Sequence, residues 1–154
     1  MNTLERAIRQ SLEHVFVTSF DETPPVRCIT AASQPTQGCQ SAYMVVSGTA
    51  HGVIALWTEC VTAAELVRSL LGISPGSSWD TTMVPDGLCE LLNMIAGGAK
   101  ARLVGTPWHF LLSCPLTTEP MEVDDSRNHV LALEAETSVG IVRIRVSIAP
   151  AGDL

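Results

Sequence analysis

Residues 80–104 read DTTMVPDGLCELLNMIAGGAKARLV, and this stretch decides how the rest of the chain is interpreted. Its apolar residues recur at helical spacing, which predicts one helix from about Asp80 to Val104 with a buried side. That side carries Leu88, Leu91, Leu92, Ile95, Ala99 and Leu103. At about 100° per residue, five residues fall within about 80° of one another on the other side. We call these five the polar stripe: Asp86, Glu90, Asn93, Gly97 and Lys100.

The polar stripe is unusual for a helix face selected only for solubility. Asparagine is a poor helix former, and glycine in an exposed helix interior costs roughly 1 kcal/mol relative to alanine. The fold alone does not explain the adjacent pair Gly97 and Gly98, and a missing side chain lets another backbone come close. Lys100 is the only lysine of the chain. The alternative is an ordinary solvated face, because such faces contain Asp, Glu, Asn and Lys.

The composition predicts one core-rich globular domain spanning residues 1–154. Hydrophobic residues make up 46% of the chain and charged residues 16%, which is typical of a folded domain. No apolar run reaches the roughly 18 residues that span a bilayer, and the N-terminal residues mix charge with apolar side chains. We therefore expect a cytoplasmic protein without a membrane contact. The net charge of −7 and the scattered arginines argue against nucleic-acid binding, which needs a clustered basic face.

The five cysteines are expected to be reduced thiols, because their number is odd, their spacings are wide and no C-x-x-C occurs. No Cys/His pair has ligand spacing, so we expect neither a metal ion nor a cofactor on this chain. Nucleophilic catalysis of the Ser/His/Asp or Cys/His kind is the rival enzymatic hypothesis. Cys89 lies beside Glu90, but we expect it to point away from Asn93, and no histidine is its neighbour in sequence.

The other predicted elements form a rough internal repeat. A helix at 3–17 and the helix at 80–104 each precede three strands, and a linking helix spans 59–71. The predicted strands cover residues 26–31, 41–47, 52–57, 108–114, 129–136 and 139–148. Their alternation of apolar and polar residues is typical of antiparallel hairpins with one covered face. The sequence predicts an α+β fold of two pseudo-repeats, each a helix followed by three antiparallel strands.

The spacing Asp86-x-x-x-Glu90-x-x-Asn93 resembles the core motif of the CheX/CheC/FliY family of phosphatases, which dephosphorylate the response regulator of bacterial chemotaxis. Residues 90–103 (ELLNMIAGGAKARL) look like the family's E-L-x-N-M-I-x-G-x-A-K. Residues 47–72 look like its Gly-x-x-x-Gly hairpin and Ala-rich helix, and residues 111–120 like its strand-then-proline stretch. The single motif copy and the chain length resemble the CheX branch, since CheC carries two copies. The resemblance implies a CheC-like α/β sandwich.

The resemblance also implies the substrate, an aspartyl phosphate on a CheY-like response regulator, whose receiver domain supplies a magnesium ion and a lysine. Phosphoryl transfer is catalysed mainly by positioning and electrostatics, so one oriented water can suffice. A neutral amide suits this task, and we assign it to Asn93. In the family the matching Glu meets the receiver's lysine, and this role falls to Glu90.

The rest of the polar stripe is assigned to partner binding. Gly97 gives the receiver's loop room, and Lys100 meets acidic receiver residues unless it is a plain solvated lysine. Asp86 matches the first motif position, and it either contacts the partner or caps the helix. The resemblance implies a homodimer, and we expect the apolar strands at 41–57 to offer a sheet edge for pairing. The alternatives are a module that binds a receiver without turnover, or a dimerisation domain whose polar stripe packs on the protein's own surface.

Overall fold

The structure, a computed structural model, describes residues 1–30, 35, 37–117 and 125–151. The elements follow the predicted order, in which one helix precedes three strands and two further helices precede the last three strands; short 3-10 turns are η1 (Thr81–Met83) and η2 (Asp125–Arg127). The α-helices are α1 (Thr3–Phe20), α2 (Cys60–Leu70) and α3 (Val84–Arg102). The strands are β1 (Val26–Cys28), β2 (Cys39–Gly48), β3 (Ala50–Glu59), β4 (Phe110–Leu112), β5 (His129–Thr137) and β6 (Gly140–Pro150). The last residue of the predicted strand 26–31 lies outside the described residues.

Side-chain caps and prolines set where the helices begin. The Asn2 side chain accepts a hydrogen bond from the backbone N–H of Glu5 at 2.7 Å, which satisfies one free donor of α1. Asp80 does the same for the turn that leads into α3, where its carboxylate accepts from the Thr82 backbone at 3.0 Å. Pro85 lies in the first turn of α3, where its missing N–H costs nothing. Gly105, with φ +78°, follows the end of α3.

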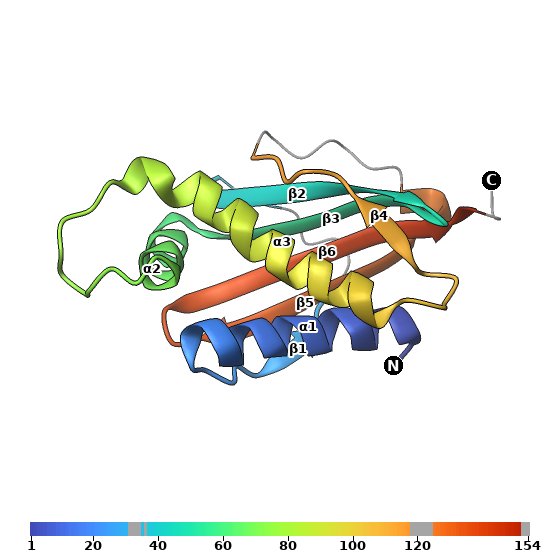
Figure 1. The fold of residues 1–154 in the computed structure, drawn as a ribbon, viewed down its shortest axis with the longest axis horizontal. Helices are drawn as coiled ribbons and strands as arrows, with labels where there is room; N and C mark the ends of the chain where they lie inside the picture. Colours follow the sequence, from blue (N-terminus) through green and yellow to red (C-terminus); the bar gives the residue numbers. More distant parts are fainter. Residues whose placement is uncertain (31–34, 36, 118–124, 152–154) are drawn as a thin grey trace.

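The six strands form one antiparallel sheet in the order β1-β5-β6-β3-β2-β4 (Figure 1). Two hairpins, β2–β3 and β5–β6, meet through β3 and β6 in the middle of the sheet. If the labels β1, β2 and β3 are exchanged with β4, β5 and β6, respectively, the new strand order is the original order read backwards. The two halves of the chain therefore occupy equivalent places in the sheet. The predicted fold class, with two pseudo-repeats of a helix followed by three antiparallel strands, is therefore confirmed.

The three helices lie over one face of the sheet (Figure 1). The core between the two layers combines helix residues such as Leu88 and Ile95 with sheet residues such as Ile54, Leu56 and Val146. Every second strand residue points into this layer, so the alternation seen in the sequence becomes one apolar face. None of the helices among the described residues is long and apolar enough to cross a membrane.

Two glycines allow α3 to lie close to its helical neighbours. A Cβ at Gly87 would collide with the Val67 side chain of α2, and a Cβ at Gly98 would collide with the Ser11 hydroxyl of α1. That hydroxyl is buried and donates a 2.6 Å hydrogen bond to the Ile95 carbonyl. The expectation that the fold does not explain the glycine pair is therefore wrong for Gly98, because helix packing requires it.

The expectation that strands 41–57 offer a sheet edge is also wrong. β3 pairs with β2 on one side and with β6 on the other along nearly its whole length. β2 pairs with β4 over Val46–Gly48, and Tyr43 bridges to Leu116 farther along. The edge strands are instead β1 and β4, each only three residues long. Apolar runs predict burial, and here burial comes from neighbouring strands of the same chain.

Candidate functional site

The polar stripe lies along the outer side of α3. Asp86, Glu90 and Asn93 are exposed, whereas Gly97 and Lys100 are half-buried. At about 1.5 Å per residue, Glu90 precedes Asn93 by about 4.5 Å along the helix axis, and Lys100 follows Asn93 by about 10.5 Å. The structure thus brings all five residues together on one open helix face.

The side chains of the polar stripe are not used by the rest of the protein. No described residue forms a hydrogen bond or ion pair with the side chain of Asp86, Glu90, Asn93 or Lys100. A stripe that serves only as an internal contact would be buried and hydrogen-bonded. The arrangement therefore does not fit a dimerisation domain whose stripe packs on its own surface.

Asp86 does not cap its helix. It is the third residue of α3, and the first turn of α3 carries no side-chain cap hydrogen bond. The preceding turn is capped by Asp80, whose pKa is lowered by the hydrogen bonds that it accepts from Thr82. The negative charge of Asp86 is still stabilised by the partial positive charge of the helix N-terminus. The structure shows no capping hydrogen bond from Asp86, which is an exposed carboxylate next to Glu90, and its role in orienting the helix or contacting a partner stays a prediction.

Gly97 and Gly98 differ in what surrounds them. A Cβ at Gly97 would meet nothing within 4 Å, whereas Gly98 is pressed against Ser11. Because Gly97 has no side chain, the helix backbone between Asn93 and Lys100 is left uncovered at this position. No packing contact accounts for this glycine, although it lowers helix stability by roughly 1 kcal/mol.

Cys89 lies nearer to Asn93 than predicted. The two residues are four apart on one helix, so their side chains are neighbours, and the expectation that Cys89 points away is wrong. The thiol is half-buried, however, and its pKa is raised, first by burial and then by the negative charge of Asp86. A raised pKa keeps the thiol protonated, whereas a nucleophile requires the thiolate. This environment argues against cysteine catalysis.

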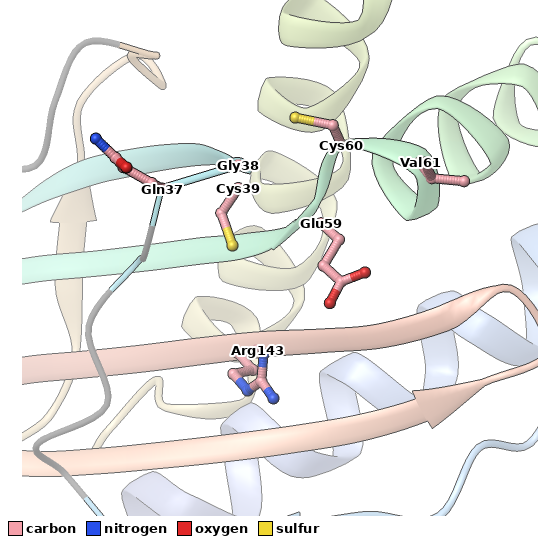
Figure 2. A pocket seen from close by; sticks show the side chains of 7 residues that line it. All are labelled: Gln37, Gly38, Cys39, Glu59, Cys60, Val61 and Arg143. Atoms are coloured by element: carbon pink, nitrogen blue, oxygen red, sulfur yellow. The ribbon is translucent and has the colours of Figure 1, made fainter.

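A cavity of about 340 Å³ lies away from the polar stripe. Figure 2 shows its lining, which comes from the residues before β2 and its first residue, from the junction of β3 and α2, and from β6. It is lined by Gln37, Gly38, Cys39, Glu59, Cys60, Val61 and Arg143. None of these residues was predicted to be functional, and none belongs to α3. Within the described ranges, no group of three or more His, Cys, Asp or Glu side chains is placed to hold a metal ion.

Comparison with known families decides how the polar stripe is to be interpreted. The family described as chemotaxis phosphatase CheX matches the chain over residues 41–135. The chain belongs to the CheX family. The matched region includes α3 and therefore the whole polar stripe. No functionally curated protein matches the chain at a significant level.

Three solved structures share the fold at low sequence identity. A putative chemotaxis protein from Desulfovibrio vulgaris Hildenborough has a TM-score of 0.75 at 19% identity, covering 95% of this chain and 96% of its own. A CheC-like superfamily protein from Shewanella sp. PV-4 has a TM-score of 0.74 at 21% identity, and the match covers 97% of this chain and 99% of that protein. The CheX–CheY–BeF3–Mg2+ complex from Borrelia burgdorferi matches at a TM-score of 0.70 and 15% identity, covering 94% and 96%. These likenesses show the CheC-like fold.

Proposed function

We propose that this protein accelerates hydrolysis of the aspartyl phosphate on a CheY-like response regulator. Its membership of the CheX family, described as chemotaxis phosphatases, supports this proposal. The observation that carries it is that the side chains of Glu90 and Asn93 are exposed, one turn apart on an open helix, and form no hydrogen bond or ion pair with another described residue. A CheX relative in complex with CheY adds support for the kind of partner.

Asn93 orients the attacking water in this proposal. Its amide offers one acceptor and two donor hydrogens, and it carries no charge that would repel the phosphoryl oxygens. The receiver holds the phosphoryl group with its own lysine and a magnesium ion, so the missing component is a placed nucleophile. Because α3 is a rigid element packed against α1 and α2, it holds the amide in a fixed direction and thus lowers the entropic part of the barrier.

Glu90 docks the receiver. Its carboxylate is exposed about 4.5 Å along the axis from Asn93, within reach of an ammonium group beside the phosphoryl site. Asp86 adds a second carboxylate at the same end, and Lys100 contacts acidic receiver residues at the other end. Gly97 leaves room for a receiver loop to approach the helix backbone.

The rest of the assembly follows the family resemblance. We propose that residues 1–154 act as one domain in a cytoplasmic homodimer, with no cofactor on this chain and magnesium bound by the receiver. Neither three-residue edge strand offers a long pairing edge. A dimer that forms through β1 or β4 therefore needs side-chain contacts in addition to backbone pairing.

Turnover tests the proposed function. A phosphorylated CheY-like receiver is mixed with a small molar fraction of this protein, and phosphate release is followed over several turnovers. The expected result is an accelerated rate that Asn93→Ala abolishes with little change in KM. Glu90→Ala is expected to raise KM more than it lowers kcat.

The alternative, a binding module without turnover, gives a different outcome. A binder protects or sequesters the phosphorylated receiver at one-to-one stoichiometry, and phosphate release does not continue beyond that amount. If the wild-type protein accelerates no CheY-like receiver, or if Asn93→Ala is as fast as wild type, the catalytic role of Asn93 is refuted.

A further inference from the structure

The sheet face opposite the helices carries charged side chains that are joined across strands. Val142 and Ile144 belong to the core under the helices, so Arg143 between them points to the opposite face. The buried Glu134 carboxylate of β5 accepts hydrogen bonds from Arg27 and from the Arg143 Nε, the latter at 2.9 Å. One carboxylate thus holds two guanidinium groups, and it fixes the direction of the Arg143 side chain.

The Arg143 guanidinium keeps unused hydrogen-bond donors. A guanidinium has five N–H groups. In the part of the chain that the structure describes, only the Nε–H of Arg143 has an acceptor. Its two amino groups therefore remain available, and such a pair of amino groups matches the two oxygens of a carboxylate.

Glu59 brings an unused carboxylate to the same face of the sheet. Trp57 pairs with Arg143 between β3 and β6, so Glu59, two residues further along β3, is a diagonal neighbour of Arg143. Diagonal neighbours are about 7–8 Å apart, within reach of long side chains. The Glu59 side chain makes no capping hydrogen bond to α2, and it forms no ion pair with Arg143 or with any other described residue. Two opposite charges thus lie near each other without being joined.

Both charged groups line the cavity of about 340 Å³. Figure 2 shows the Glu59 carboxylate and the Arg143 guanidinium facing the same open space, with no other labelled side chain between them. Ligand pockets measure about 300–1,000 Å³, so the volume of this cavity suits a small molecule. The cavity offers separate partners for a negative and a positive group of one such molecule.

We propose that this cavity binds a free α-amino acid. The carboxylate of the ligand accepts hydrogen bonds from the two amino groups of Arg143, and its ammonium group donates to the Glu59 carboxylate. The site contains no residue of α3, and the inference does not depend on the proposed function.

The charges of the cavity favour a zwitterion over a simple ion. A dianion such as a phosphate ester would meet the Glu59 carboxylate as a like charge, and Glu134 already balances part of the positive charge of Arg143. A simple cation would meet the Arg143 guanidinium as a like charge. A molecule with one carboxylate and one ammonium group satisfies both side chains.

A direct ion pair between Glu59 and Arg143 is the alternative use of these charges. An exposed ion pair contributes little to stability, and this one is not formed in the structure. The alternative predicts that the cavity takes no amino acid, and that Glu59→Gln changes nothing but the free energy of unfolding.

Isothermal titration calorimetry of the protein without a receiver, with each of the standard amino acids in turn, tests the proposal. We expect at least one amino acid to bind with a Kd below about 1 mM. The methyl ester of that amino acid lacks the negative charge, and its N-acetyl derivative lacks the positive charge. Each derivative is expected to bind about 10-fold more weakly than the free amino acid, because one charge-assisted contact is lost.

Glu59→Gln removes the partner of the ammonium group and keeps the shape of the side chain. The variant is expected to bind the free amino acid about 10-fold more weakly, and to bind the N-acetyl derivative within about twofold of wild type. The matched control is Glu136→Gln, which removes another exposed carboxylate, one that does not line the cavity. This control is expected to change the affinity by less than about twofold.

Arg143→Lys keeps the positive charge but loses the planar pair of amino groups, and it is expected to weaken binding about 10-fold. Its matched control is Arg27→Lys, because Arg27 also donates to Glu134 but does not line the cavity. This control is expected to change the affinity by less than about twofold. Thermal unfolding shows whether each variant keeps the fold. If Arg143→Lys does not fold, Glu59→Gln and the two ligand derivatives still test both contacts.

Three results would overturn the proposal. The first is that no standard amino acid binds at about 10 mM, as the direct ion pair predicts. The second is that the methyl ester or the N-acetyl derivative binds as tightly as the free amino acid. The third is that Glu59→Gln keeps the wild-type affinity. None of these measurements involves a receiver, so a failure of the phosphatase proposal leaves this result unchanged.

Discussion

Replacing each of the two adjacent glycines of α3 by alanine separates a glycine kept for packing from one kept for a partner. Gly97→Ala places a methyl group where nothing lies within 4 Å. It gains about 1 kcal/mol of helix propensity, so the free energy of unfolding is expected to rise by up to about 1 kcal/mol. Gly98→Ala gains the same propensity, but its methyl group collides with the buried Ser11 hydroxyl.

The cost at Gly98 can be worked out from that contact. Pushing Ser11 away loses its hydrogen bond to the Ile95 carbonyl, about 1 kcal/mol, and forces a shift of α1 that costs about 1–3 kcal/mol. After the propensity gain, Gly98→Ala is expected to destabilise the protein by about 1–3 kcal/mol. The two variants then differ by about 2–4 kcal/mol, or about 5–15 °C in melting temperature.

Chemical denaturation of the two variants, with and without Ser11→Ala, checks this reasoning. Removing the hydroxyl leaves the Ser11 Cβ at 3.4 Å from the new methyl group, so Gly98→Ala is expected to cost clearly less in that background. Despite its stability, Gly97→Ala is expected to weaken receiver binding. Equal destabilisation by both alanines, or no coupling between Ser11 and Gly98, would refute the assignment of one glycine to packing and the other to docking.

Three further variants test the packing around the site and the sheet face away from the helices. The buried Glu134 carboxylate accepts hydrogen bonds from Arg27 and from Arg143, the latter at 2.9 Å. Glu134→Gln is therefore expected to lower the free energy of unfolding, measured by urea denaturation, by about 1–3 kcal/mol. The control Glu136→Gln, at an exposed position, is expected to change it by no more than about 0.5 kcal/mol. The pKa of Glu134 is lowered, first by the hydrogen bond from Arg27. The ionised carboxylate therefore contributes to stability near neutral pH, and this contribution is lost as the pH falls through the lowered pKa. In acid unfolding, the stabilities of Glu134→Gln and wild type are expected to differ least at the lowest pH. Gly87→Ala, whose methyl group collides with Val67, is expected to lower the melting temperature by several degrees, and an unchanged value would show that α2 can move away.

The sequence predicted the elements well because their periodicities are strong. The 3.6-residue period in α3 and the alternation in β5 and β6 each indicate one element and one buried face. The internal repeat that the sequence predicts appears in the sheet as a strand order that maps onto its own reverse. The open stripe with Asp86, Glu90 and Asn93 was predictable because helical spacing fixes which residues share a side.

What the sequence could not show depends on contacts between distant segments. Whether Gly98 serves packing depends on Ser11, 87 residues earlier, and no local pattern indicates which helix lies beside it. The apolar run of β2 and β3 has the same composition whether its neighbour is another strand of the chain or a second molecule. The cavity lined by Arg143 and Glu59 combines elements that are far apart along the chain. Such features follow from topology and not from periodicity.

The most direct test of the central claim is the rate of phosphate release by the variant Asn93→Asp, measured with a phosphorylated CheY-like receiver in large excess over enzyme. The two side chains have nearly the same shape, but the carboxylate carries a charge that repels the phosphoryl oxygens. If a neutral amide orients the attacking water, Asn93→Asp loses the acceleration while the protein stays folded. A variant that hydrolyses the phosphoaspartate as fast as wild type would contradict the account, because a charged group would then serve in place of the amide.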